Sequence, residues 1–228
     1  VAKYRYMSGG QFVVPLTIRS AQGGGAGFGT QHSQCGESWL MNFPGIKVGV
    51  PATPLDMYGL LRAAIRDDNP VYVLEHKALY NMKGEVPEQV EPMALGEAQI
   101  VREGTDVTIV AIQMMLHRAL EAASQLENDG INCEVIDLRT MAPLDTRTVL
   151  ESIKKTNRLV IVEEAPHAAS WGGDIASLAA DEGIYYLEAP VKRVNLGASL
   201  IPYSPPLEDH AIPTTERIIK AIRETVSA

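Results

Sequence analysis

Apolar and polar positions alternate along the chain with the periods of strands and helices, and the pattern falls into two series. In the first, β-branched apolar runs at 12–18 and 46–50 and the alternating run 71–75 predict strands. A helix is expected to begin after the capping residue Thr53 and to stop before Asn69, because an apolar face repeats at helical spacing between them. Strand, helix and strand in this order predict a parallel α/β unit.

A longer series of the same kind follows a stretch rich in proline, glycine and acidic residues. We place a linker at 83–104, between a first domain at 1–82 and a second at 105–228. The pattern of the second series predicts strands at 107–112, 133–138, 158–163 and 191–194, and helices at 116–128, 145–155, 172–180 and 214–226. These elements suffice for a complete three-layer α/β domain. The first series has too few strands for an independent sheet, so we expect it to lack its beginning.

Composition and charge exclude several classes of protein. The chain of 228 residues is 46% hydrophobic and carries 20 Lys+Arg against 28 Asp+Glu, a net charge of -8 without a basic tract, which argues against nucleic acid and anionic membranes as partners. No apolar run reaches the ~18–20 residues of a membrane span, and no signal peptide is recognisable. Cys35 and Cys133 lie outside any CxxC or zinc-ligand spacing. A reducing, cytoplasmic compartment fits this composition best.

A glycine run at 23–29 leads into Gln31–Gln34 and then into a short helical pattern. Such a run lets the backbone approach a ligand closely and move as a loop, but it matches neither a P-loop nor a dinucleotide fingerprint. We expect His32 to lie just before a helix amino end, where the helix dipole keeps the imidazole neutral and available for proton transfer. The alternative is a flexible surface loop with an incidental histidine.

Polar residues at the end of the predicted first helix suggest a second kind of chemistry. Asp67 and Asn69 follow the last helical residues, and carboxylate, amide and free helix carbonyl oxygens are the ligands that hard cations prefer. A solvated helix end explains the same residues without a ligand.

Other candidates are weaker. The segments 137–140 and 163–167 follow predicted strands, at the sheet edge where open α/β folds place ligands, although loop polarity and helix capping explain them equally. His117 and His210 suit packing or surface roles, and His76 is open to either interpretation.

A set of ordered motifs resembles one enzyme family over essentially the whole chain. The motifs are Ala2–Tyr6, Ser8–Gly10, Leu16–Arg19, Gln31–Gln34, Pro44–Val48, Gly59–Leu61, Ala64–Pro70, Leu74–Lys77, Gly84–Pro87, Val135–Thr140, Pro143–Asp145 and Pro205–Glu208. Together they resemble the β subunit of the thiamine-diphosphate-dependent first component of 2-oxo acid dehydrogenase complexes, of the pyruvate or acetoin dehydrogenase type.

The resemblance implies a transketolase-like fold with a partial pyrimidine-binding domain followed by a carboxyl-terminal domain. It implies oxidative decarboxylation of a 2-oxo acid, with acyl transfer to lipoyl-lysine of a dihydrolipoyl acyltransferase. Magnesium and thiamine diphosphate would be shared with an α subunit in an α2β2 assembly. Acetoin or a branched-chain 2-oxo acid is an alternative substrate, and a catalytically silent association fragment is an alternative of another class.

The resemblance also assigns residues. His32 corresponds to the family's histidine for proton handling and acyl transfer, and a structural potassium site maps onto Leu16, Thr17, Ala64, Asp67 and Asn69. The family's catalytic glutamate and other pyrimidine contacts correspond to positions upstream of Val1, so the chain's cofactor-binding residues are left unassigned. No GDG followed by asparagine at the spacing for magnesium diphosphate is present, which in this family belongs to the α subunit.

Overall fold

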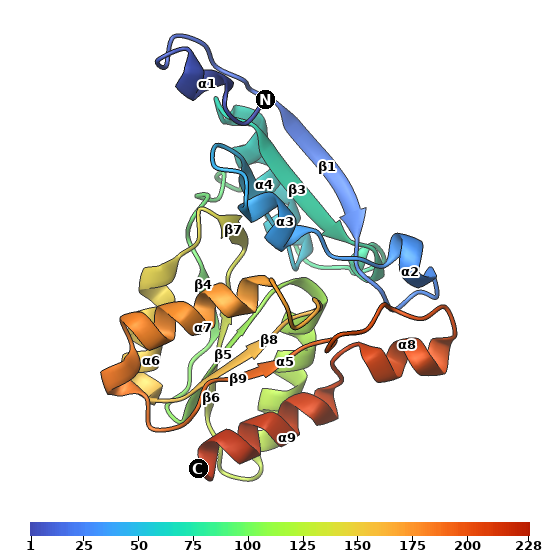
Figure 1. Cartoon of the computed structure of the whole chain (residues 1–228), viewed down its shortest axis with the longest axis vertical. Helices are drawn as coiled ribbons and strands as arrows, with labels where there is room; N and C mark the ends of the chain where they lie inside the picture. Colours follow the sequence, from blue (N-terminus) through green and yellow to red (C-terminus); the bar gives the residue numbers. More distant parts are fainter.

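Two β-sheets lie one above the other along the long axis of the molecule, in a computed structural model that describes residues 1–228 (Figure 1). The upper sheet has the order β1-β3-β2-β7, and the lower sheet has the order β4-β6-β5-β8-β9. The chain therefore folds as two α/β units, each built around one sheet.

The upper sheet is built mainly from the first series. Strands β1 (Thr17–Gln22), β3 (Val71–His76) and β2 (Lys47–Gly49) run parallel, and helix α4 (Pro54–Arg66) connects β2 to β3. Thr53 caps α4 by accepting a hydrogen bond from the backbone N–H of Asp56. The fourth strand, β7 (Thr140–Ala142), is antiparallel and comes from the second series, so the two units are interleaved in sequence.

The lower sheet has helices on both faces and therefore forms three layers (Figure 1). Its strands are β4 (Gln99–Arg102), β6 (Cys133–Asp137), β5 (Val107–Ala111), β8 (Leu159–Val162) and β9 (Lys192–Val194), all parallel except β4. Helices α5 (Gln113–Glu127) and α9 (Thr215–Val226) pack on one face, and α6 (Thr146–Thr156) and α7 (Trp171–Asp181) on the other. Alternate residues of β5 enter the two cores, since Ile109 belongs to one and Val110 to the other.

Short helices complete the fold. They are α1 (Tyr4–Met7), α2 (Gly29–His32), α3 (Glu37–Met41), α8 (Pro205–Ala211) and the single turns η1 (Lys77–Leu79) and η2 (Ile184–Tyr186). At one edge of the molecule the segment that leads into α8 runs beside α2 (Figure 1), and Thr30 of α2 donates a hydrogen bond to Ile201 O, although the two segments are far apart in the sequence.

The predicted strand at 12–18 is wrong in position. Phe12 and Val13 are exposed, and the first strand begins at Thr17, which pairs with Val71. Pro15 has no backbone N–H and cannot donate to a strand ladder, which explains the later start. Strand β1 lies at the edge of the sheet and its middle residues are exposed and partly polar. A search for alternating apolar residues therefore does not detect it.

Several short elements escaped the sequence analysis, among them two strands and a helix of the second series. Strand β4 lies inside the range assigned to a linker and pairs with β6, while β7 and α8 were not expected at all. Each is short, and a pattern of three to seven residues carries little periodic signal.

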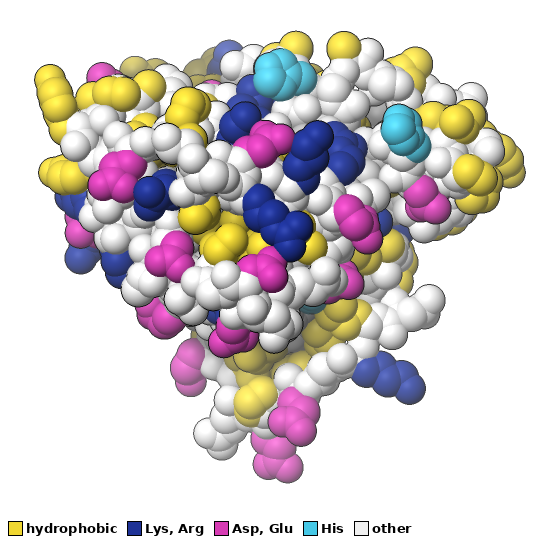
Figure 2. All heavy atoms as spheres, turned by 90° about the horizontal axis from the view of Figure 1, so that it is seen from below, with side chains coloured by type: hydrophobic (Ala, Val, Ile, Leu, Met, Phe, Trp, Pro, Cys, Tyr) yellow, Lys and Arg dark blue, Asp and Glu magenta, His cyan; other side chains and the backbone are white.

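No helix of the structure combines the length and the apolar composition needed to cross a membrane. On the face seen from below in Figure 2, basic and acidic side chains are interspersed, so neither sign of charge dominates that surface.

Candidate functional site

The glycine-rich loop connects the end of β1 to α2 and needs glycine for its backbone shape. Gly23, Gly25, Gly27 and Gly29 all have positive φ, at 85°, 85°, 70° and 65°. Every second residue thus adopts a conformation that costs an L-residue roughly 1–2 kcal/mol, which explains why the glycines recur at alternate positions.

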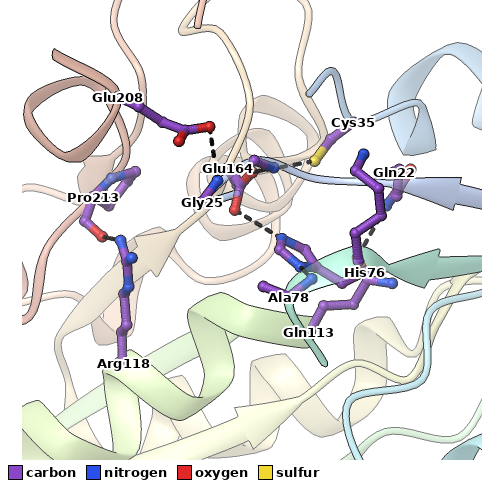
Figure 3. A network of polar contacts seen from close by, with 12 residues as sticks. Gln22, Gly25, Cys35, His76, Ala78, Gln113, Arg118, Glu164, Glu208 and Pro213 are labelled. Carbon is purple, nitrogen blue, oxygen red and sulfur yellow. Dashed lines mark hydrogen bonds and ion pairs between the residues drawn. The ribbon is translucent and has the colours of Figure 1, made fainter. Parts of the chain in front are cut away.

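Two carboxylates from the second unit hold the amino half of this loop (Figure 3). Gly24 N donates to Glu164 Oε1 at 2.5 Å. Gly25 N and Gly27 N donate to Oε1 and Oε2 of Glu208, each at 2.9 Å. The loop backbone is therefore fixed by groups that lie more than 130 residues away in the sequence.

Lys77 and Thr30 restrain the other half of the loop. The ammonium of Lys77 donates a hydrogen bond to the carbonyl oxygen of His32 and lies 5.5 Å from the ring centroid of Phe28. Burial lowers the pKa of Lys77 from its ordinary value. Thr30 Oγ1 donates to Ile201 O at 3.4 Å. Both ends of α2 are thus tied to neighbouring segments.

His32 is exposed at the end of α2, where residues 26–32 and Tyr203 line an open hollow. The expectation that it precedes a helix amino end is wrong: it is the last residue of α2, and α3 begins only at Glu37. A dipole argument for a neutral ring therefore fails. The exposed imidazole can still be reached by a substrate that enters from solvent.

A buried network of amides and a carboxylate lies beneath the loop (Figure 3). The amide of Gln22 donates to Glu37 and to Gln113 Oε1, the latter at 2.9 Å, and Gln22 Oε1 accepts from Gly36 N at 2.9 Å. Gln113 donates in turn to Leu74 O at 2.7 Å. Burial raises the pKa of Glu37 to about 7, so this carboxyl gains or loses its proton near neutrality.

Glu164 joins the glycine-rich loop to the end of β3. His76 Nε2 lies 3.0 Å from Glu164 Oε2, and both side chains are buried. The thiol of Cys35 lies 3.9 Å from Glu164 Oε1, and burial raises its pKa well above the ordinary value, which keeps it protonated. Glu164 therefore has one oxygen on His76 and the other on the loop and on Cys35.

A cavity of about 750 Å³ opens beside this network. It is bounded by the first turn of α4, by His76 and by the ion pair that Arg19 forms with Glu75. Tyr58 and Tyr80 contribute polar tips to an otherwise largely apolar wall. The cavity can accept a small molecule of mixed apolar and polar character.

The residues assigned to a potassium site gather at the opposite end of the upper sheet. Leu16 O accepts from Val71 N at 2.9 Å, and Thr17 pairs with the same residue. Asp67 and Asn69 follow α4, and Asp67 N donates to Ala64 O at 3.3 Å.

Asp67 already has partners for both oxygens. Its Oδ1 accepts from the backbone and side-chain nitrogens of Asn69, each at 2.8 Å, and its Oδ2 pairs with the ammonium of Lys47. These contacts contribute to a lowered pKa of Asp67, against the opposing effect of burial. Since Lys47 supplies a positive charge at this point, a bound cation would compete with it, and the potassium site stays a prediction.

The remaining sequence candidates have structural partners. Glu163 is buried and accepts hydrogen bonds from Arg193, Ser170 and the backbone of Gly172. Burial and the nearby charge of Asp56 raise the pKa of Asp137 to about 7.

The other histidines make no hydrogen bond to the loop. His117 Nε2 is 2.8 Å from Ala52 O, His167 Nδ1 is 3.0 Å from the amide nitrogen of Asn195, and His210 is exposed on α8.

Sequence reasoning missed Gln22, Glu37, Lys77 and Glu208 as parts of this site. Gln22 and Glu37 flank the glycine run closely enough to have been considered with it. Glu208 ended one of the family motifs, and Lys77 ended another, but neither motif indicated which loop the side chain would contact.

The resemblance implies a magnesium ion. No group of three or more His, Cys, Asp or Glu side chains in the structure lies close enough to hold one.

Fold and domain order define a transketolase-like protein. The family model described as "Transketolase, pyrimidine binding domain" matches residues 1–83, and "Transketolase, C-terminal domain" matches residues 96–218. A solved structure entitled "Split gene transketolase, inactive beta4 tetramer" superposes with a TM-score of 0.76 at 26% identity, over 94% of this chain and 68% of that one.

Relatives in sequence show which transketolase-like proteins the chain resembles most. The chain is 46% identical to the acetoin:2,6-dichlorophenolindophenol oxidoreductase subunit beta of Bacillus subtilis, over 98% of this chain and 65% of that protein. It is also 46% identical to the pyruvate dehydrogenase E1 component subunit beta of Rickettsia felis, over 98% and 68%. The chain belongs to this family of β subunits, and it spans about two thirds of the length of these relatives.

Proposed function

We propose that the chain acts as the β subunit of a thiamine-diphosphate-dependent 2-oxo acid dehydrogenase of the pyruvate dehydrogenase type. Its reaction would be oxidative decarboxylation of the 2-oxo acid and acyl transfer to lipoyl-lysine. The names of its relatives support this class. The cofactor, when bound, supplies the electron sink for decarboxylation, and the protein supplies position and protons.

The observation that carries the proposal is the placement of His32. Its ring lies on an exposed hollow, while the loop before it is held by Glu164 and Glu208. Acyl transfer opens the dithiolane, and the departing sulfur needs a proton. An imidazole titrates near neutral pH and is the usual side chain for such a proton transfer.

Partners follow from the same proposal. The relatives are named as β subunits, and an α subunit in an α2β2 assembly would hold the magnesium diphosphate. A dihydrolipoyl acyltransferase would present its lipoyl domain at the hollow beside His32.

Acetoin cleavage is the second candidate, because relatives of equal identity carry the acetoin and the pyruvate names. Assays of the reconstituted assembly with pyruvate and with acetoin, using 2,6-dichlorophenolindophenol as acceptor, decide between them. A silent association fragment would give no turnover with either substrate.

His32→Ala tests the role of the histidine. In the assembly reconstituted with an α subunit, acyl transfer to a lipoyl domain should fall by ~100-fold, the usual scale of general acid–base catalysis. Turnover with the artificial acceptor should fall less, because that assay bypasses the lipoyl step. His210→Ala removes an exposed histidine of α8 and serves as the control. Equal losses in both assays would contradict a specific role in acyl transfer.

A further inference from the structure

We propose that Glu208 is a positioning residue for His32: its carboxylate sets the backbone of the glycine-rich loop and thereby the place of the imidazole. This inference rests on the proposed function of His32. It concerns the contact between α8, near the carboxyl end of the chain, and the glycine-rich loop, near its amino end.

The contact is bidentate. Oε1 of Glu208 accepts from Gly25 N and Oε2 accepts from Gly27 N, both at 2.9 Å. Both glycines have positive φ, at 85° and 70°. A glycine without such a partner samples many backbone conformations. Two charge-assisted hydrogen bonds to one carboxylate therefore restrict the backbone of the loop where its glycines are most flexible.

The carboxylate of Glu208 is buried and bonds only to the backbone of the loop. Glu208 is 2% exposed, although it belongs to a short helix whose other early residues are exposed. None of the ion pairs in the structure includes it, so backbone N–H groups are its direct partners. A buried carboxylate without a basic partner is costly unless hydrogen bonds compensate its lost hydration, and here the loop provides them.

The segment before α8 supports the other end of the loop. A methyl group placed at Gly29 would lie 3.0 Å from Cδ2 of Tyr203, so the tyrosine lies directly behind the first residue of α2. Figure 1 shows this segment running between α2 and α8. Glu208 thus fixes Gly25 and Gly27, and Tyr203 closes off the space behind Gly29, three residues before His32.

Loss of the carboxylate should therefore loosen the loop without removing any group that contacts substrate. Glu208→Ala should lower kcat for acyl transfer by about ten-fold, since hydrogen bonds to a charged acceptor stabilise by enough to give a change of that order. The KM for the 2-oxo acid should stay unchanged. This split separates positioning of a proton-transfer group from a defect in substrate binding.

Hydrogen exchange of the chain in its assembly measures the restraint itself. Glu208→Ala should accelerate exchange in the peptide 23–34 by about ten-fold, because two protected amides lose their acceptor. Glu208→Gln keeps the size of the side chain and one accepting oxygen, and should give a smaller acceleration; it also covers the case in which Glu208→Ala does not fold. Asp209→Ala removes the neighbouring exposed carboxylate of α8, which has no hydrogen-bond partner, and should change nothing.

A double-variant cycle links the loop to the histidine. On a His32→Ala background, Glu208→Ala should cause no further loss of acyl transfer, because the residue it positions is gone. Unchanged exchange in Glu208→Ala, or fully additive losses in the double variant, would overturn the inference. Normal acyl transfer in His32→Ala alone would instead show that the proposed function of His32 has failed, so the two failures are distinguishable.

Discussion

Glu37 makes the stability of the protein depend on pH. Its carboxyl lies in the first turn of α3, is 2% exposed, and accepts a hydrogen bond from Gln22. Burial is the largest cause that raises its pKa from 4.5 to about 7, and the charges of Glu164 and Glu163 act in the same direction. Glu37→Gln replaces it with a neutral side chain of the same shape.

The sign follows from proton binding. Between pH 4.5 and about 7 the folded state holds a proton on Glu37 that the unfolded state has released. The free energy of unfolding therefore falls as pH rises through this window and levels off above it. A shift of this size corresponds to about 3 kcal/mol, present below the lower pKa and lost above the upper one. Asp137, whose pKa is also raised to about 7, adds a change of the same sign.

Urea denaturation at pH 5 and pH 8 measures this difference. The free energy of unfolding should fall between the two pH values by about 3 kcal/mol less in Glu37→Gln than in the unsubstituted chain. The pH dependence that remains in Glu37→Gln comes from other groups such as Asp137. Glu88→Gln, at an exposed position, is the control. Parallel stability curves for Glu37→Gln and the unsubstituted chain would refute the assignment of this titration to Glu37.

Two further predictions concern the loop and the cation residues. Gly23→Ala should lower the free energy of unfolding by about 3 kcal/mol, because its methyl group would meet His76 Nε2 at 2.2 Å in a left-handed backbone. Gly25 has the same φ but open space around it, so Gly25→Ala should lower the free energy of unfolding by about half as much, as measured by thermal or urea unfolding. Potassium should raise the thermal midpoint by mass action, more so in Lys47→Met, where the competing ammonium is absent, and not in Asp67→Ala. Equal responses of the unsubstituted chain and Asp67→Ala would rule this site out.

The second unit was predictable from the sequence because its central strands are buried on both faces. Strand β8 is an uninterrupted apolar run and β5 is interrupted only by Thr108, and the sequence analysis placed both within a residue or two. Helix α9 was readable for another reason: Thr214 caps it, and an apolar face repeats from Ile218 to Ile222.

The parts that escaped prediction depend on contacts distant in sequence. Residues 140–142 form strand β7 because they pair with the edge of β2, some ninety positions earlier in the sequence. Glu208 is 183 positions from Gly25, and no local pattern relates the two. His32 was found through a motif, but its place at the end rather than before the start of a helix required the fold of the whole loop.

The candidate site lies where strand ends of both sheets converge. Gln22 and His76 are the last residues of β1 and β3, while Gln113 and Glu164 come within two residues of the ends of β5 and β8. Carboxyl ends of parallel strands are the general location of ligand sites in open α/β sheets, and here two sheets bring such ends to one point. Since Glu164 joins His76 to the loop, the loop carrying His32 can take its observed shape only when both units are folded against each other.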